Sequence, residues 1–286
     1  MIRHRSHPLR DAHRPAHPAR LLTVSATLAL VLSVTAIPAA AERIALPIAD
    51  PALPVRLEVS LPNGSLEVFG TDTSEVIVEF GEEDDLERDG EPEKVNGMYR
   101  IPNRSFGLTA EAKGNTVEVS GGWGGDLTVR IEVPRRTSMR LHSIGGDAMT
   151  VRDIEGDLEL NCISGDIEAR GVRGSVVAHS TNGDIAVEIA ALGERKAMSF
   201  ITFNGDIDVT FPADFAADLR IGTMQGEVFS DFELEIVPTT AQVERDTEMV
   251  RYRVEREIRA TLGGGGEETR FKSWNGDVFV RRAGAR

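Results

Sequence analysis

Two histidine–serine pairs offer the residue types that a catalytic nucleophile and its base require. His142–Ser143 and His179–Ser180 each place an imidazole beside a hydroxyl. Both pairs lie where apolar and polar residues alternate, and neighbouring side chains on such a strand point to opposite faces. Each serine therefore turns away from its histidine. We predict that the chain has no catalytic residues and is not an enzyme.

Metal binding is the second chemistry that the sequence suggests. Glycines at positions 156, 165, 174 and 183 are nine residues apart, as in roll-type calcium repeats. The six-residue pattern G-G-x-G-x-D, however, occurs once, at residues 121–126. Calcium rolls need consecutive copies to supply their ligands. We predict no metal site and no cofactor.

Carboxylates that project from the predicted strands leave one enzymatic alternative open. Stacked-strand folds also host polysaccharide lyases and hydrolases, which need paired carboxylates, and Glu159, Glu168 and Asp208 occupy outward positions. A ladder of such acids is more often a solvated face that limits aggregation. A polysaccharide-acting enzyme is therefore the alternative to a noncatalytic protein.

The single cysteine, Cys162, cannot form an internal disulfide. It stands where other repeats have serine or threonine, so we expect a buried small residue. A reactive thiol would need a neighbouring cation to depress its pKa, and the sequence offers none nearby. Stability must then come from burial and hydrogen bonding.

These residues are positioned by a repeat in which a glycine is followed by Asp, Glu or Ser and then by an apolar residue. Alternation after each glycine is typical of a half-buried strand. Each glycine provides a corner that tolerates positive φ, and the Asp that follows can accept hydrogen bonds from nearby amides. We interpret these aspartates as structural. The glycines are Gly64, Gly125, Gly146, Gly156, Gly165, Gly174, Gly183, Gly205, Gly226 and Gly276.

The glycines divide into two sets that mark two corners of a coil. In the first set, the residue three positions earlier is small and polar or weakly polar, and the set advances by 19, 18, 22 and 21 residues from Gly146 to Gly226. Gly156 and Gly174 belong to the second set and lie between these steps. The residues before the first set are Ser143, Cys162, Ser180, Thr202, Thr223 and Ser273.

This spacing predicts an all-β chain folded as a flattened β-solenoid, a β-helix-like stack with about two short strands per coil of 18–22 residues. Successive coils would stack at about 4.8 Å and direct the small residues into a shared dry interior. His142 and His179 would then share a column with Asn161 between them. Their imidazoles would be roughly 9 to 10 Å apart, too far to share a zinc ion.

Strand signals continue outside this central array, over residues 54–80, near Thr116 and over residues 127–133. The acidic stretch 81–96 has little to bury and is typical of a solvated loop. Residues 233–262 are compatible with strand or helix. Alternation of Val250, Tyr252 and Val254 with charged residues favours strand.

The first 41 residues have the composition of an export signal. Five arginines precede an apolar run over residues 21–37 and three alanines at 39–41, so we expect cleavage near Ala41 and a single β-repeat domain over residues 42–286. The apolar run is shorter than the roughly 20 residues that span a bilayer. We expect no transmembrane segment in the mature chain, and a periplasmic, secreted or cell-surface location.

The chain is acidic, with 46 acidic and 32 basic residues. The leader contains five arginines and one aspartate, so the mature chain keeps 45 acidic and 27 basic residues. This excess repels nucleic acid. We predict no nucleic-acid partner.

Aromatic side chains near the corners are the remaining binding candidates. Trp123, Phe203 and Trp274 stand two residues before their glycines, in a mostly apolar column for which corner packing is the simpler interpretation. Phe229 and Phe279 take the outward position that other coils fill with Glu or Asp. The candidate binding surface is therefore Phe229, Phe279 and Trp274. A cap over that face is the alternative explanation for the two phenylalanines.

The element N-G-D-I-x-V at residues 182–187 and 204–209, with N-G-D-V-F-V at 275–280 and the leader, resembles a bacterial family of β-strand repeat domains of unknown function. These are called "putative adhesin" or toastrack domains. The resemblance covers residues 55–282. It implies a right-angled stack of short strands, an extracytoplasmic location and association with envelope-stress or cell-surface systems, and it supplies no catalytic residues.

The expected function is an exported, noncatalytic binding or scaffold module of the cell envelope. Its expected partner is an unidentified envelope protein or glycan.

Overall fold

The computed structural model describes residues 42–82, 94–95, 98–99, 107–122, 127–193, 197–238, 242–245, 250–253 and 257–284. The expected cleavage site at Ala41 and most of the acidic stretch 81–96 lie outside these ranges. Residues 38–286 form one compact unit. All regular structure in the described part is strand, which confirms the all-β prediction. None of the described residues belongs to a helix with the length and hydropathy to cross a membrane.

The strands are short. In chain order they are β1 Glu42–Pro47, β2 Val55–Leu61, β3 Leu66–Thr71, β4 Glu75–Glu82, β5 Lys94–Val95, β6 Met98–Tyr99, β7 Thr109–Lys113, β8 Thr116–Ser120, β9 Leu127–Pro134, β10 Thr137–Ser143, β11 Ala148–Arg152, β12 Leu158–Ser164 and β13 Asp166–Arg173. They continue with β14 Val176–Asn182, β15 Ile185–Ala191, β16 Met198–Asn204, β17 Ile207–Phe211, β18 Ala217–Gln225, β19 Val228–Ser230, β20 Glu235–Val237, β21 Gln242–Arg245, β22 Val250–Arg253, β23 Ile258–Leu262, β24 Glu268–Asn275 and β25 Val278–Arg282.

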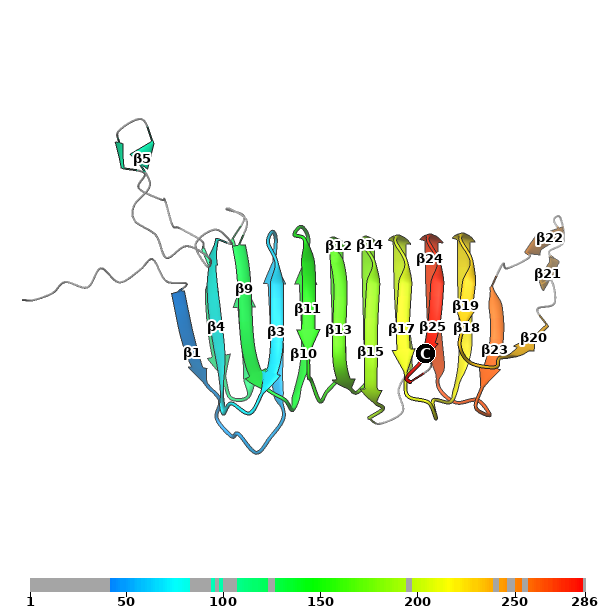
Figure 1. Ribbon diagram of the computed structural model, residues 1–286, viewed down its shortest axis with the longest axis horizontal. Coiled ribbons are helices and arrows are strands. Elements are labelled where there is room, and N and C mark those ends of the chain that lie inside the picture. Colours follow the sequence, from blue (N-terminus) through cyan, green and yellow to red (C-terminus); the bar gives the residue numbers. More distant parts are fainter. Residues whose placement is uncertain are drawn as a thin grey trace, which may run out of the picture. The chain divides into compact units, whose positions relative to one another are not determined.

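Two long sheets form the body of this unit (Figure 1). Sheet A has the order β1-β4-β9-β3-β11-β13-β15-β17-β25-β19, and sheet B the order β20-β23-β18-β24-β16-β14-β12-β10-β2-β8-β7. From β9 to β19 in sheet A, and from β18 to β8 in sheet B, neighbouring strands are parallel. Each coil contributes one strand to each sheet, which confirms the flattened β-solenoid with two strands per coil.

Antiparallel strands close both ends of the parallel stack. Beyond β9 lie β4 and β1, and beyond β8 lies β7. At the other end, β23 and β20 follow β18 in sheet B. Within the described parts of residues 233–262, the regular structure consists of the strands β20, β21, β22 and β23, as expected. Gly81–Glu82 and Lys94–Val95, at the borders of the predicted acidic loop, also belong to strands.

The coils are not stacked in chain order near the two ends. The β24–β25 coil lies between the β16–β17 and β18–β19 coils, and the β2–β3 coil lies between β8–β9 and β10–β11. The expectation that first-set glycines stack in chain order is correct from Gly146 to Gly205 and wrong at Gly226, because Gly276 lies between Gly205 and Gly226. Every coil carries the same local pattern, so the pattern cannot specify which coil is the neighbour.

The column of small residues is buried, as predicted, except at Thr223, which is half-buried. Register pairs Ser143 with Cys162, Cys162 with Ser180, and Thr202 with Ser273. Gly183 belongs to the corner of the preceding coil, and its carbonyl accepts a hydrogen bond from the Thr202 hydroxyl at 3.0 Å. Ser273 and Thr223 donate in the same way to the corner carbonyls of Gly205 and Gly276. These bonds satisfy buried polar groups and fasten each corner to the next.

Apart from these small polar residues, the interior between the sheets is mainly apolar. Inward side chains such as Leu141, Leu160 and Phe200 have no exposed surface. Phe200 stacks on Phe271 of the inserted β24, with ring centroids 5.3 Å apart. This contact is one of the features that place β24 beside β16.

Candidate binding surfaces

The two histidine–serine pairs are split between the faces of sheet B. His142 and His179 lie half-buried on the outer face, whereas Ser143 and Ser180 are buried in the interior. Asn161 stands between the histidines in register, as predicted. Burial lowers the pKa of His179, while the nearby Glu159 acts in the opposite direction. Neither pair therefore places its hydroxyl beside its imidazole.

The three outward carboxylates considered for catalysis are each paired with an arginine. Glu159 accepts from Arg140 at 2.8 Å on sheet B. On sheet A, Asp208 accepts from Arg281 at 2.7 Å, and this bond raises the pKa of Arg281. Glu168, also on sheet A, lies 2.6 Å from the Arg170 Nε atom. Ala186 separates Glu168 from Asp208 in register, so the structure does not bring these carboxylates onto adjacent strands.

Metal ligands do not converge within the described part of the chain, where no group of three or more His, Cys, Asp or Glu side chains could hold an ion. Residues 123–126 of the calcium-like sequence lie outside the described ranges. Cys162 is buried, its thiol donates to the Ser164 carbonyl at 3.3 Å, and burial raises its pKa. The thiol therefore has the surroundings of an inert core cysteine, as expected.

A shallow groove of about 380 Å³ runs across the outer face of sheet B. Its charged groups are occupied with one another: Arg140 binds Glu159, and Arg56 lies 3.5 Å from Glu58. The Ser175 hydroxyl donates to Asp157 at 2.7 Å. The groove thus presents polar groups that are already paired.

In most coils a sheet-B strand is followed along the chain by a sheet-A strand, and a first-set glycine forms the corner between them. These corners lie at the upper end of the strands in Figure 1, and we call this border of the stack the first edge. Two residues before these corners lies an exposed apolar row on the outer face of sheet B. Its members are Ile163, Phe203, Trp274 and Met224, which are 43%, 48%, 39% and 48% exposed. Corner packing, the interpretation favoured from sequence, is therefore wrong for this row. Trp123 lies outside the described residues.

Aromatic stacking makes the middle of the apolar row continuous. Phe203 and Trp274 lie on neighbouring strands in register, with ring centroids 5.4 Å apart and planes 16° apart. The two rings are therefore nearly parallel and in contact, and both remain partly exposed. Such a row is suited to packing against apolar side chains along the stack.

Phe229 and Phe279 form a second stacked pair, on the outer face of sheet A. Their centroids are 5.0 Å apart and their planes 9° apart. Arg281 lies 5.1 Å over the Phe279 ring while it binds Asp208. The outward position expected for both residues is correct, but Trp274 lies on the outer face of the other sheet. The three predicted residues thus belong to two surfaces.

Beyond the corners of the first edge, the residue that follows each glycine is acidic in six adjacent coils. We call this the acidic row: Asp147, Asp166, Asp184, Asp206, Asp277 and Glu227. Asp166 accepts the amide of Asp184 at 2.8 Å, and Asp184 accepts the amide of Asp206 at 2.8 Å. The structural role predicted for these aspartates is confirmed for Asp166, Asp184, Asp206 and Asp277, whose side chains each accept the amide of the next coil instead of their own corner. Asp147 accepts the Asp166 amide with its backbone carbonyl.

Part of the chain matches a known protein family. Residues 125–259 match the family model Toastrack DUF4097. The chain contains a toastrack domain. The matched segment ends before β24 and β25, although the toastrack stack places these strands between two coils that the match includes.

Two solved structures are similar to this chain. One is described as a putative cell adhesion protein from Clostridium sporogenes, with 11% identity, a TM-score of 0.47, and coverage of 85% of this chain and 99% of that one. The other is described as a putative adhesin from Bacteroides fragilis, with 10% identity, a TM-score of 0.28, and coverage of 84% and 96%. No curated protein matches the chain significantly.

Proposed function

We propose that this toastrack protein is an exported, noncatalytic binding or scaffold module of the cell envelope, with an envelope protein or glycan as its partner. The observation that carries the proposal is the exposed stacked pair Phe203–Trp274 on a rigid parallel stack. Exposed aromatic side chains held in one geometry are the residue type that dominates binding energy at interfaces. The leader and the acidic composition support a location outside the cytoplasm.

Photo-crosslinking in cells tests this proposal. A benzophenone amino acid replaces Phe203 in one strain and Phe279 in a second, and the adducts are analysed for protein and for carbohydrate. A control strain carries it at Glu111, an exposed residue of the edge strand β7. We expect a specific envelope adduct from an aromatic position and none from Glu111. Absence of a specific adduct from both aromatic positions would contradict the proposal.

A further inference from the structure

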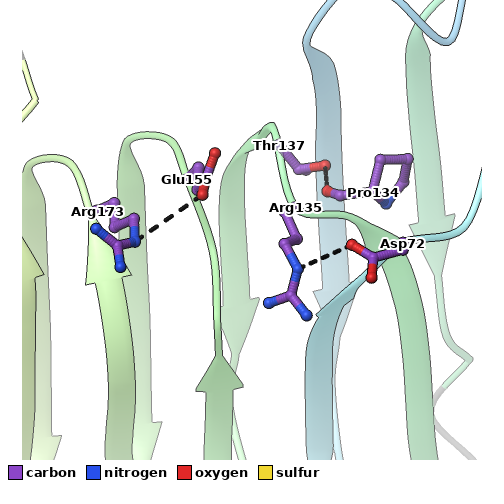
Figure 2. A network of polar contacts seen from close by, with 6 residues as sticks. All are labelled: Asp72, Pro134, Arg135, Thr137, Glu155 and Arg173. Carbon is purple, nitrogen blue, oxygen red and sulfur yellow. Dashed lines mark hydrogen bonds and ion pairs between the residues drawn. The ribbon is translucent and has the colours of Figure 1, made fainter.

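Many acids on the other surfaces of the described chain are paired with arginines. On the sheet faces, acids such as Glu67, Glu159 and Asp208 are paired with arginines. At the opposite edge, Asp72 pairs with Arg135 and Glu155 with Arg173, as Figure 2 shows. Of the ion pairs formed within the described residues, none involves a member of the acidic row.

Neighbouring coils therefore carry like charges side by side along the first edge. Adjacent strands are about 4.8 Å apart, and like charges directly opposite each other on neighbouring strands are destabilising. The hydrogen bond to the next amide needs an acceptor oxygen but no charge, since the amide oxygen of Asn could provide it. The hydrogen bonds thus explain why an acceptor oxygen stands at this position, but they do not explain why that side chain carries a negative charge.

The apolar row runs parallel to the acidic row along the same edge. In each coil only two residues separate the two rows, as Asn204 and Gly205 separate Phe203 from Asp206. The Asn side chains are themselves linked, because Asn275 donates to Asn204 at 2.6 Å and Asn204 donates to Asn182 at 2.8 Å. The result is a strip with an anionic side and a mostly apolar side, in which Thr181 stands between Ile163 and Phe203.

We propose that this strip is the docking site of a basic amphipathic helix supplied by a polypeptide partner. The inference rests on the proposed binding function and specifies its partner. The apolar stripe of the helix packs on the apolar row, and its Lys or Arg side chains pair with the acidic row. A helix with its side chains is about 10 to 12 Å wide, which is enough to cover both rows.

The coil spacing favours a helix over an extended peptide. Along a helix, side chains on one face recur every three or four residues, an advance of about 5.4 Å per turn, close to the coil spacing of about 4.8 Å. An extended peptide places side chains on one face about 6.6 Å apart, so it falls out of step within two coils. The acidic row also repels anionic lipid, which disfavours a membrane as the occupant.

Fluorescence anisotropy with a labelled synthetic peptide tests the inference. The probe is an 18-residue Leu/Lys helix with segregated stripes. One control peptide has the same composition in scrambled order, and another has Glu in place of Lys. We expect the probe to bind the purified protein at least ten-fold more tightly than either control peptide, and to weaken as salt rises. Equal binding of the scrambled peptide would overturn the inference, because charge alone would then suffice.

Two double variants locate the probe on the strip. F203S with W274S removes the centre of the apolar row, and D184N with D206N removes charge while keeping the amide acceptors. We expect each to weaken probe binding at least ten-fold. The matched control is F229S with F279S, which removes the stacked pair on the other sheet and should change binding less than two-fold. Circular dichroism confirms that all variants are folded.

The outcomes separate this inference from the proposed function. A glycan adduct at Phe203 in cells, or binding to phosphatidylcholine vesicles that depends on Trp274, would overturn the helix inference and leave an envelope-binding role intact. Probe binding that F229S with F279S abolishes would also overturn it. Absence of any adduct from both aromatic positions would remove the proposed function itself.

Discussion

The corner glycines of the first edge make the sharpest prediction about stability. Gly183 has φ of +150°, and a Cβ atom at this residue would lie 2.1 Å from the carbonyl oxygen of Gly165. The same corner is held by hydrogen bonds from Gly183 to Asn204 and from Gly165 to Asn182, each 2.9 Å long. Gly183→Ala must therefore either force the coils apart or distort the corner.

The expected cost combines two effects. A side chain at this backbone conformation costs about 1 to 3 kcal/mol, and loss of the two corner hydrogen bonds costs about 1 kcal/mol each. We expect Gly183→Ala to lower the free energy of unfolding by about 3 to 5 kcal/mol, or Tm by roughly 10 °C for a domain of this size. Urea and thermal denaturation followed by circular dichroism measure both quantities.

Two control substitutions separate the effects. Gly114 has φ of +65° with no atom within 4 Å of a Cβ position, so Gly114→Ala should cost only about 1 kcal/mol. At Gly193 the nearest atom would be an ordinary 3.5 Å away, and Gly193→Ala should change stability by less than about 0.5 kcal/mol. If Gly183→Ala costs no more than Gly114→Ala, the close approach of the coils does not constrain the corner and the reasoning is refuted.

Three further predictions concern buried polar groups. Thr202→Val removes the buried donor to the Gly183 carbonyl and should cost about 1 to 2 kcal/mol in urea denaturation. Burial lowers the pKa of His179 below the ordinary value of 6.5. The folded state therefore has its full stability, with respect to this group, above pH 6.5, and it loses stability as the pH falls below 6.5. His179→Asn should therefore reduce the loss of stability between about pH 7 and pH 5. The raised pKa of the buried Cys162 thiol predicts slow reaction with Ellman's reagent in the native protein and fast reaction in urea.

Each of these predictions has its own control. Thr181→Val changes an exposed residue of β14 and should cost less than about 0.5 kcal/mol; an equal cost at both positions would show that the Thr202 hydrogen bond is not stabilising. His142→Asn removes the other histidine of the column and leaves the contribution of His179 in place, so a pH dependence that disappears with His142 contradicts the assignment. A native Cys162 that reacts as fast as in urea would contradict its burial.

Much of the fold is predictable from sequence because its determinants are local. A glycine, an acceptor side chain and two alternating strands recur in each coil, and the spacing alone specifies two strands per coil. The inward column of Ser143, Cys162 and Ser180 follows from the same spacing. None of these inferences requires knowledge of which coil is the neighbour.

Coil order and side-chain exposure depend instead on contacts between distant segments. β24 lies beside β16 because Phe271 stacks on Phe200 and Asn275 bonds Asn204, and no local pattern encodes these pairings. From sequence alone, the apolar row is predicted to pack inside the corners, because apolar residues dominate its column. Phe203 and Trp274 remain exposed because their side chains point to the outer face of sheet B, opposite the buried Thr202 and Ser273.

The inserted β24–β25 coil affects the order in which the stack can form. In a repeat array stacked in chain order each repeat contacts only its neighbours, so a shortened chain can still form its earlier layers. Here β24 and β25, residues 268–282, follow the β18–β19 coil in the chain and yet occupy a slot between that coil and the earlier β16–β17 coil. Until β24 and β25 are added, the β16–β17 and β18–β19 coils lack their common neighbour, so this part of the stack forms only after a later segment of the chain is available.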